Sequence, residues 1–152
     1  MQKTLRKLWS QTLLPMLSRP VRLQVAALCW REGATGREVL LVTSRGTGRW
    51  VIPKGWPMAG KTSAQSAAQE AWEEAGVRKG YFTDVPLGSY HYGKRLDSGA
   101  VEPLETLVYA VEVTELRDDF PEADQRNRQW FPPKEAARLV DEPELSAILS
   151  RF

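Results

Sequence analysis

Short apolar runs separated by turn-forming residues occupy most of the chain from Val21 onward, and this pattern predicts β-strands. The run Thr106–Val113, which reads TLVYAVEV, is expected to be a central strand. A Gly-containing turn after the first run makes the first two runs a predicted hairpin. The predicted strands are Val21–Trp30, Glu38–Thr43, Trp50–Pro53, Tyr81–Tyr92, Thr106–Val113 and Gln129–Phe131.

Helices are predicted in three segments, at about residues 62–75, 132–140 and 142–149. Thr62 or Ser63 can cap the first of them, and Gly76 is placed to end it in the left-handed conformation. Pro132 or Pro133 is expected to open the second. No repeat or linker divides residues 21–152, so the expected fold class is α/β, with a mixed central sheet and helices on its faces in one domain.

The composition limits the classes of protein and the kinds of metal site that the chain can form. With 152 residues, 42% of them hydrophobic and 26% charged, the chain is typical of one globular domain, and a net charge of +2 does not indicate nucleic-acid binding. Cys29 is the only cysteine and lies in an apolar run, so it is interpreted as core packing, and a reducing, cytoplasmic setting is expected. Because His91 is the only histidine, a zinc site is excluded, and oxygen ligands for Mg²⁺ or Mn²⁺ are left.

The first 20 residues form a predicted basic N-terminal arm that contains no acidic residue. Leu5, Leu8, Trp9 and Leu13 stand at helical spacing within it. An organellar presequence or a membrane-surface helix has this character. The preferred interpretation is a terminal helix or arm that packs its apolar stripe on the domain. No apolar stretch of the sequence approaches the roughly 20 residues that a membrane span requires, so none is expected.

Three acidic residues mark the end of the first predicted helix. Glu70, Glu73 and Glu74 stand at i, i+3 and i+4, so they share one helical face. Like charges at this spacing repel one another, and the negative end of the helix dipole disfavours them further. A hard divalent cation reverses both penalties, which favours a metal site. The simpler interpretation is a solvated acidic helix end.

The residues before this helix favour the metal site over the solvated end. Gly55 and Gly60 frame a loop that lets backbone groups approach a ligand. Cations that suit phosphate oxygens flank the loop and helix, namely Arg45, Arg49, Lys54 and Lys61.

The segment from Gly55 to Val77 resembles the signature of the Nudix hydrolases. That signature is a Gly, five residues, a Glu, seven residues, Arg-Glu, an aliphatic residue, any residue, Glu-Glu, any residue, Gly and an aliphatic residue. In register with it are Gly55, Glu70, Glu73, Glu74, Gly76 and Val77, with Ala71 at the inner aliphatic position. The chain departs from it at Lys61, where the family has Glu, and at Gln69, where the family has Arg.

The resemblance extends over roughly Val21 to Val140 and is nearest to the diphosphoinositol polyphosphate phosphohydrolase branch and its bacterial relatives. The segments Thr43–Gly55, Thr106–Glu115 and Arg126–Phe131 carry it. It implies the Nudix α/β/α sandwich and a pyrophosphohydrolase that cleaves phosphoanhydride bonds.

The same resemblance implies the roles of individual residues. The expected metal site for Mg²⁺ or Mn²⁺ consists of Glu70, Glu73, Glu74 and the backbone carbonyl of Lys54, with Glu70 and Glu74 as the main ligands. Glu73, the expected proton acceptor, and Glu70 are the expected catalytic residues. In-line attack of metal-bound water on phosphorus follows from these roles. The expected substrate-binding residues are Thr43, Ser44, Arg45, Arg49, Lys54, Lys94, Arg95 and Arg128.

The substrate stays open at this stage. A nucleoside-diphosphate-linked or diphosphoinositol-polyphosphate-like compound is the leading expectation, and a dinucleoside-polyphosphate or nucleotide-sugar pyrophosphatase is the alternative enzyme. A catalytically silent Nudix-like domain that binds a phosphorylated ligand is the alternative from another class. Retention of all three acids argues against silence, and the exchanges at Lys61 and Gln69 argue mildly for it. The sequence leaves the oligomeric state open.

Overall fold

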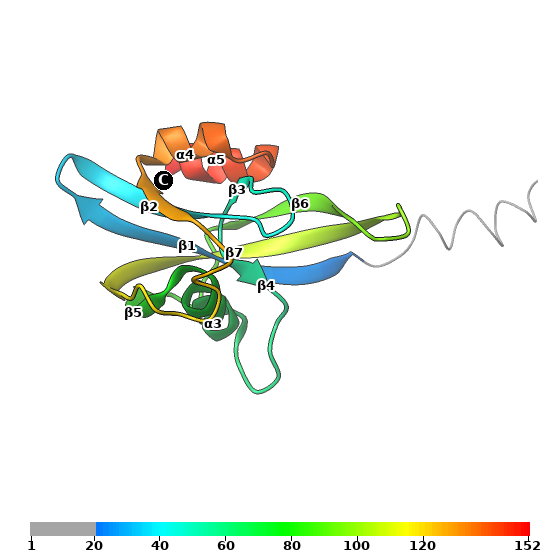
Figure 1. Ribbon diagram of the computed structural model, residues 1–152, viewed down its shortest axis with the longest axis horizontal. Helices are drawn as coiled ribbons and strands as arrows, with labels where there is room; N and C mark the ends of the chain where they lie inside the picture. The colour runs from blue at the N-terminus through cyan, green and yellow to red at the C-terminus, as the bar shows by residue number, and fades with distance from the viewer. Residues whose placement is uncertain (1–20) are drawn as a thin grey trace, which may run out of the picture.

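A mixed sheet of eight strands with helices on both faces makes up residues 21–152, the part of the chain that the computed structural model describes (Figure 1). The predicted arm at residues 1–20 lies outside the described residues. The strands are β1 (Arg22–Gly33), β2 (Gly36–Thr43), β3 (Trp50–Val51), β4 (Lys54–Gly55), β5 (Val77–Phe82), β6 (Gly88–Arg95), β7 (Val101–Leu116) and β8 (Arg128–Phe131). The helices are α3 (Ser63–Ala75), α4 (Pro133–Leu139) and α5 (Pro143–Arg151). The α/β prediction is confirmed.

The long strand β7 organises the sheet, as its predicted central position requires. It pairs in parallel with β1 along one edge and antiparallel with both β5 and β6 along the other. The prediction of one strand over Tyr81–Tyr92 is therefore wrong. Residues 83–87 leave the sheet between β5 and β6, and Pro86 has no N–H to donate to a ladder there.

The segment Trp50–Pro53 also divides in two. Trp50 and Val51 form β3, which pairs antiparallel with the end of β2, whereas β4 crosses to pair with β1, where Lys54 lies opposite Ala26. This crossing brings the peptide of Lys54 next to the C-terminal half of α3, and Figure 1 shows β4 beside α3. The functional site is built around that junction.

Helix α3 begins and ends as its sequence predicts. Thr62 and Gln65 form a reciprocal capping box at its start, and Gly76 ends it in the left-handed conformation at φ 75°. A Cβ atom at Gly76 would overlap the carbonyl oxygen of Arg117, so a glycine is required there on two grounds.

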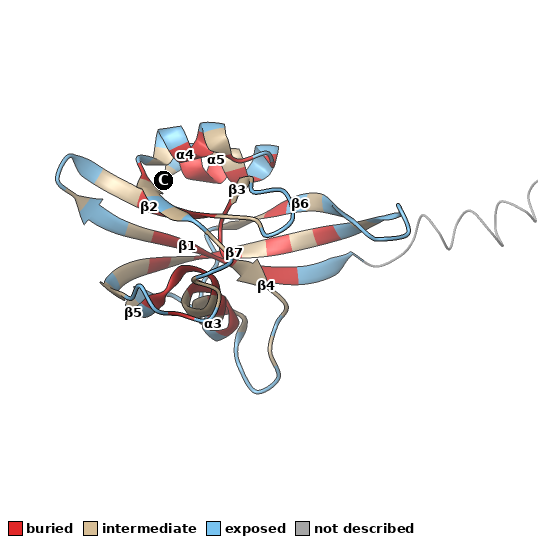
Figure 2. Cartoon of the chain, viewed as in Figure 1, coloured by how far each residue is buried: buried red, intermediate tan, exposed pale blue. Residues whose placement is uncertain are grey.

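Each face of the sheet has its own core, and Figure 2 shows the buried residues of both. Helices α4 and α5 cover one face with Leu145, Ile148 and Leu149. Helix α3 covers the other with small residues, Ala64, Ala67, Ala71 and Ala75, which pack on β1, β2 and β7. Cys29 is fully buried in this second core, as predicted. Within residues 21–152, no helix has the length and hydropathy needed to cross a membrane.

Candidate functional site

A cleft of about 780 Å³ opens where the C-terminal half of α3 faces β4, β6 and two loops. The loop after β2 supplies cationic and hydroxyl side chains, and the loop between β7 and β8 supplies an acid and an arginine. The lining includes Glu70, Glu73, Glu74, Glu122, Ser44, Arg45, Arg49, Lys54, Lys94 and Arg126. Acids from one helix and cations from several elements therefore share one cavity.

The small residues of α3 bring its acids close to the sheet. Glu70 is 9% exposed and Glu74 is 8% exposed, although both are ionisable. The backbone N–H of Lys54 donates to Oε2 of Glu74 at 3.1 Å. A Cβ atom at Gly55 would overlap the carboxylate of Glu70, so only glycine leaves room for this approach.

Burial and mutual repulsion perturb these acids. Burial first, and then the charges of Glu74, Glu73 and Glu122, raise the pKa of Glu70 to about 8. Burial also raises the pKa of Glu74, against the opposing effect of Arg126. A cluster that holds its negative charge at such a cost is a site where a bound cation is strongly favoured.

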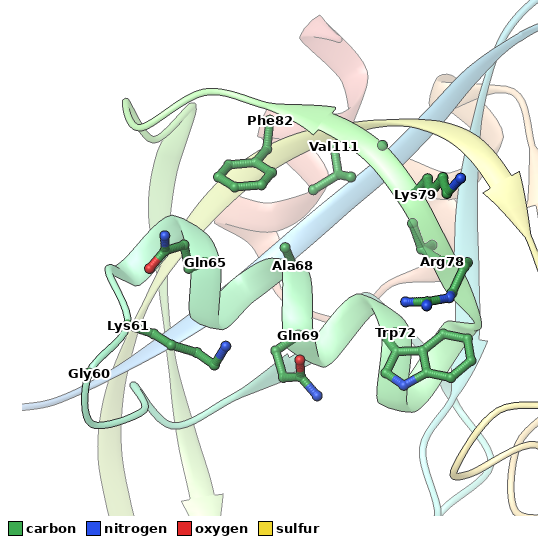
Figure 3. Close-up of a pocket in the computed structure, with 12 residues that line it drawn as sticks. Gly60, Lys61, Gln65, Ala68, Gln69, Trp72, Arg78, Lys79, Phe82 and Val111 are labelled. Atoms are coloured by element: carbon green, nitrogen blue, oxygen red, sulfur yellow. The ribbon is translucent and has the colours of Figure 1, made fainter.

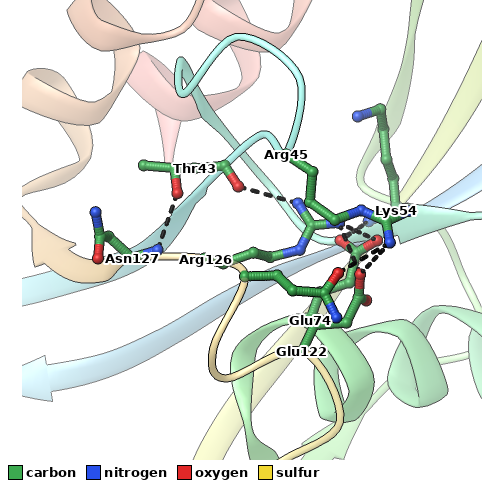
Figure 4. A network of polar contacts seen from close by, with 8 residues as sticks. Thr43, Arg45, Lys54, Glu74, Glu122, Arg126 and Asn127 are labelled. Atoms are coloured by element: carbon green, nitrogen blue, oxygen red, sulfur yellow. Dashed lines mark hydrogen bonds and ion pairs between the residues drawn. The ribbon is translucent and has the colours of Figure 1, made fainter.

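An arginine already neutralises part of this cluster (Figure 4). The guanidinium of Arg126, only 7% exposed, lies 3.2 Å from Glu74 and 3.3 Å from Glu122. Its other terminal nitrogen donates to the carbonyl oxygen of Thr43 at 3.0 Å. Arg45 contacts Glu122 from the opposite loop at 3.1 Å. Two loops are thereby fixed to the edge of α3.

The donor set fits a hard divalent cation. Its donors are carboxylate and peptide oxygens, and no hydrogen bond to the Glu70 carboxylate is recorded among residues 21–152. Over the same residues, no three acidic, histidine or cysteine side chains are gathered closely enough to hold an ion as they stand. The contact of Glu74 with Arg126 explains why, since it turns that carboxylate toward the guanidinium.

Five of the eight predicted substrate-binding residues line the cleft, namely Ser44, Arg45, Arg49, Lys54 and Lys94. Burial lowers the pKa of the Lys54 ammonium. Arg49 is anchored beside the cleft by Glu142, at 2.7 Å.

Three predicted residues lie elsewhere. Thr43 holds the loop before β8, because its hydroxyl accepts from the backbone N–H of Asn127 at 2.9 Å. Arg95 is exposed at the end of β6 and does not line the cleft. Arg128 donates to the carbonyl oxygens of Ala75 and Arg117 at 2.7 and 2.6 Å, so it binds the end of α3 to the next loop.

Neither departure from the Nudix signature lines the cleft. Gln69 donates from Nε2 to Oε1 of Glu73 at 3.2 Å, so a neutral amide still orients that acid. Lys61 does not line the cleft and faces a second cavity on the other side of α3. The loss of the family Glu and Arg therefore leaves the acidic face of the helix intact.

The sequence did not identify Glu122 or Arg126 as site residues. They lie in the segment between β7 and β8, which has no periodic pattern to place it. Trp56 also lines the cleft, next to Arg22 and Lys94, whose charged groups lie 4.2 and 5.7 Å from its ring centroid. The only available signal was the charge and aromatic character of these residues.

Comparison with solved structures shows the same fold. The Ap4A hydrolase of C. elegans superimposes with a TM-score of 0.66 at 20% identity, over 88% of this chain and 96% of that one. The E. coli dihydroneopterin triphosphate pyrophosphohydrolase gives a TM-score of 0.66 at 14% identity, over 88% of this chain and 97% of that one.

Curated relatives are more similar in sequence. Nudix hydrolase 12, mitochondrial, of Arabidopsis thaliana is 35% identical over 76% of this chain and 58% of its own length. Human diphosphoinositol polyphosphate phosphohydrolase 3-alpha is 30% identical over 77% of this chain and 68% of its own length. The chain thus spans under three-fifths of the plant relative. A model of the NUDIX domain matches residues 22–152, and on that match the chain belongs to the NUDIX domain family.

Proposed function

We propose that this protein is a divalent-metal-dependent hydrolase that cleaves a phosphoanhydride bond in a small phosphorylated substrate. One observation carries the proposal. Three acids on one face of α3 meet a rim of cations, among them Arg45, Lys54 and Lys94, in a single cleft. An acidic floor suits a metal ion, and a cationic rim suits the phosphate groups that the ion would share.

The proposed roles follow the geometry. Glu70, Glu74 and the carbonyl of Lys54 would hold Mg²⁺ or Mn²⁺, which supplies Lewis acidity toward phosphate and water. Glu73 accepts the proton of the attacking water, and its bond from Gln69 fixes the carboxylate for this task.

The rim has a different task from the floor. Arg45, Lys54 and Lys94 bind phosphate oxygens and offset the charge that develops on them during in-line displacement. No side chain forms a covalent bond to phosphorus in this scheme. The catalytic work is positioning, proton transfer and charge stabilisation.

The proposed substrate is nucleoside-diphosphate-linked or resembles a diphosphoinositol polyphosphate. The relatives named as diphosphoinositol polyphosphate phosphohydrolases support this class, since they match 77% of the chain. A dinucleoside polyphosphate is the alternative, supported by the fold shared with the Ap4A hydrolase.

The cytoplasmic location stays a prediction, because the buried thiol of Cys29, with a pKa of about 12, is inert in either redox setting.

A panel of these three substrate classes, incubated with Mg²⁺, tests the proposal through released phosphate or nucleotide. We expect turnover that requires metal, falls sharply in Glu70→Gln and Glu74→Gln, and persists in Glu135→Gln, an exposed acid on α4. Metal should also raise the melting temperature of the wild type, because it binds only the folded cluster. A melting shift without any turnover would instead support a silent binding domain. The absence of both the melting shift and turnover would refute the metal site.

A further inference from the structure

A second cavity, of about 600 Å³, lies between α3 and β5 (Figure 3). None of its lining residues lines the catalytic cleft, so the two cavities open on different sides of the same helix. Its volume falls within the range of about 300–1,000 Å³ that small-molecule sites occupy. Its lining is Gly60, Lys61, Gln65, Ala68, Gln69, Trp72, Val77, Arg78, Lys79, Gly80, Phe82 and Val111.

The charge of this cavity has one sign. Lys61, Arg78 and Lys79 line it, all three are exposed, and the lining contains no acidic residue. Among residues 21–152, the structure records no ion pair for any of the three, although most other arginines in that range have one. Three cations gathered without a counter-ion attract an anionic ligand.

Aromatic rings stand at the two ends of the cavity. Figure 3 shows Phe82 and Gln65 toward one end, and Trp72 near Arg78 at the other. The guanidinium of Arg78 lies 5.7 Å from the Trp72 ring centroid. Phe82 is 39% exposed, which leaves its face accessible to a planar group. Exposed aromatic rings beside cations are the chemistry that receives a base and its phosphate together.

Two amide side chains add directional contacts. Gln65 uses its carbonyl oxygen to accept from the backbone N–H of Thr62 at 2.9 Å, which leaves its NH₂ group to donate. Gln69 uses its NH₂ group on Glu73, which leaves its carbonyl oxygen to accept. A base edge offers donors and acceptors that match such a pair.

Both departures from the Nudix signature line this cavity and neither lines the catalytic cleft. Lys61 replaces an acid with a base in the loop before α3, so the cavity loses the negative charge that would oppose an anion. Gln69 replaces a cation with an amide, so its interior acquires an acceptor. Together, the two exchanges favour an anionic ligand that also offers hydrogen-bond donors.

We propose that the cavity between α3 and β5 is a second binding site that takes a nucleotide, with its phosphate at the end where Arg78 and Lys79 lie and its base against Phe82 at the other end. This site is independent of the phosphoanhydride cleft and does not require that the cleft be active. Its ligand is a small anion with a planar ring, and the ring and the anion are both recognised.

Amide and indole resonances of the full chain test the proposal, titrated with adenosine monophosphate in metal-free buffer. We expect the Gly60 and Gly80 amides and the Trp72 indole N–H to shift with saturable dependence. The Arg78→Glu, Lys79→Glu double variant should raise the Kd by roughly tenfold or more, because two charge-assisted contacts are lost. Lys134→Glu on α4, on the opposite face of the sheet, serves as the matched control and should leave the Kd unchanged.

Four results would overturn the proposal. The first is that these resonances do not shift at millimolar nucleotide. The second is that they shift equally in the double variant and the wild type. The third is that ribose 5-phosphate binds as tightly as the nucleotide, which would remove the base from recognition. The fourth is that adenosine binds as tightly as the nucleotide, which would remove the phosphate from recognition. Because the measurement is residue-resolved binding, it stays decisive even if the protein hydrolyses nothing.

Discussion

The two faces of the sheet carry out different tasks with different residues. The face under α4 and α5 is packed with large side chains such as Leu145, Ile148 and Leu149, and its buried acid, Glu142, is paired with Arg49 at 2.7 Å. The face under α3 is packed with alanines, and the same helix carries two buried glutamates. One face stabilises the fold through the packing of large side chains. The other buries two neighbouring acids on one helix, which costs stability.

The difference in side-chain size explains the difference in role. Alanines let α3 lie close to the sheet, so its acids reach the peptide of Lys54 and the space beside Gly55. A helix with leucines at those positions would stand further away and leave its glutamates in solvent. Small residues on this face therefore act as a spacer that sets the depth of the site.

Glu73→Gln is expected to produce the largest effect and to act on the α3 face alone. The substitution keeps the side-chain shape and removes one of three repelling charges, so the metal-free protein should be no less stable than the wild type. Metal should still raise the melting temperature through Glu70 and Glu74. Turnover, measured as kcat, should fall by roughly 10²–10⁴ because the proton acceptor is lost.

Other outcomes for this variant are equally informative. A loss of stability with nearly normal kcat would make Glu73 a structural residue. A lost metal-induced melting shift would make it a metal ligand. Gln69→Ala is the companion variant, since it removes only the bond to Glu73, and its smaller fall in kcat should come without loss of metal binding.

Leu149→Ala acts on the opposite face and should reverse the pattern. Leu149 is fully buried in the core under α5. Its truncation should cost about 2–5 kcal/mol of unfolding free energy, measured by denaturant titration. The kcat of the folded fraction should stay close to the wild-type value. Ala71→Leu is the contrasting variant, because extra volume under α3 should lower stability and kcat together. Equal loss of kcat in both variants would contradict the division between faces.

The pH dependence of stability should be the smallest effect, because the Glu70 carboxyl faces an open cleft. Its pKa of about 8 lies above the ordinary value of 4.5, so between these values the folded state keeps a proton that the unfolded state has released. Metal-free stability should therefore fall as pH rises through this window. Melting temperatures from pH 5 to 9 should decline less in Glu70→Gln than in the wild type. Parallel declines would assign the dependence to other groups.

Much of the fold could be predicted because local signals were strong. Thr62 and Gly76 set the limits of α3 with side-chain and backbone chemistry that any sequence reader can see. The strand over Tyr81–Tyr92 failed because its apolar residues suggested continuity, while Pro86 and its neighbours required a turn. The crossing of β4 to β1 could not be predicted, because it depends on long-range pairing that a two-residue strand does not indicate.

The site was predictable where its residues share an element. Glu70, Glu73 and Glu74 follow from helical spacing, and the structure places all three in one cleft. Arg126 and Arg128 are two positions apart on the chain, yet the first contacts Glu74 and the second lies at the end of α3. Only the direction of the backbone before β8 decides between them, and a single sequence does not show it.

The parallel pairing of β1 with β7 has a consequence for how the protein reaches this structure. Arg22 pairs with Leu104 and Trp30 with Glu112, so about 80 residues separate the partners along the chain. Closing so long a loop is entropically expensive, and such contacts slow folding. On the ribosome, the apolar strand β1 must therefore wait, with one edge unpaired, until β7 has emerged. We expect the newly made N-terminal half to depend on chaperones, and the cleft to be among the last parts to form.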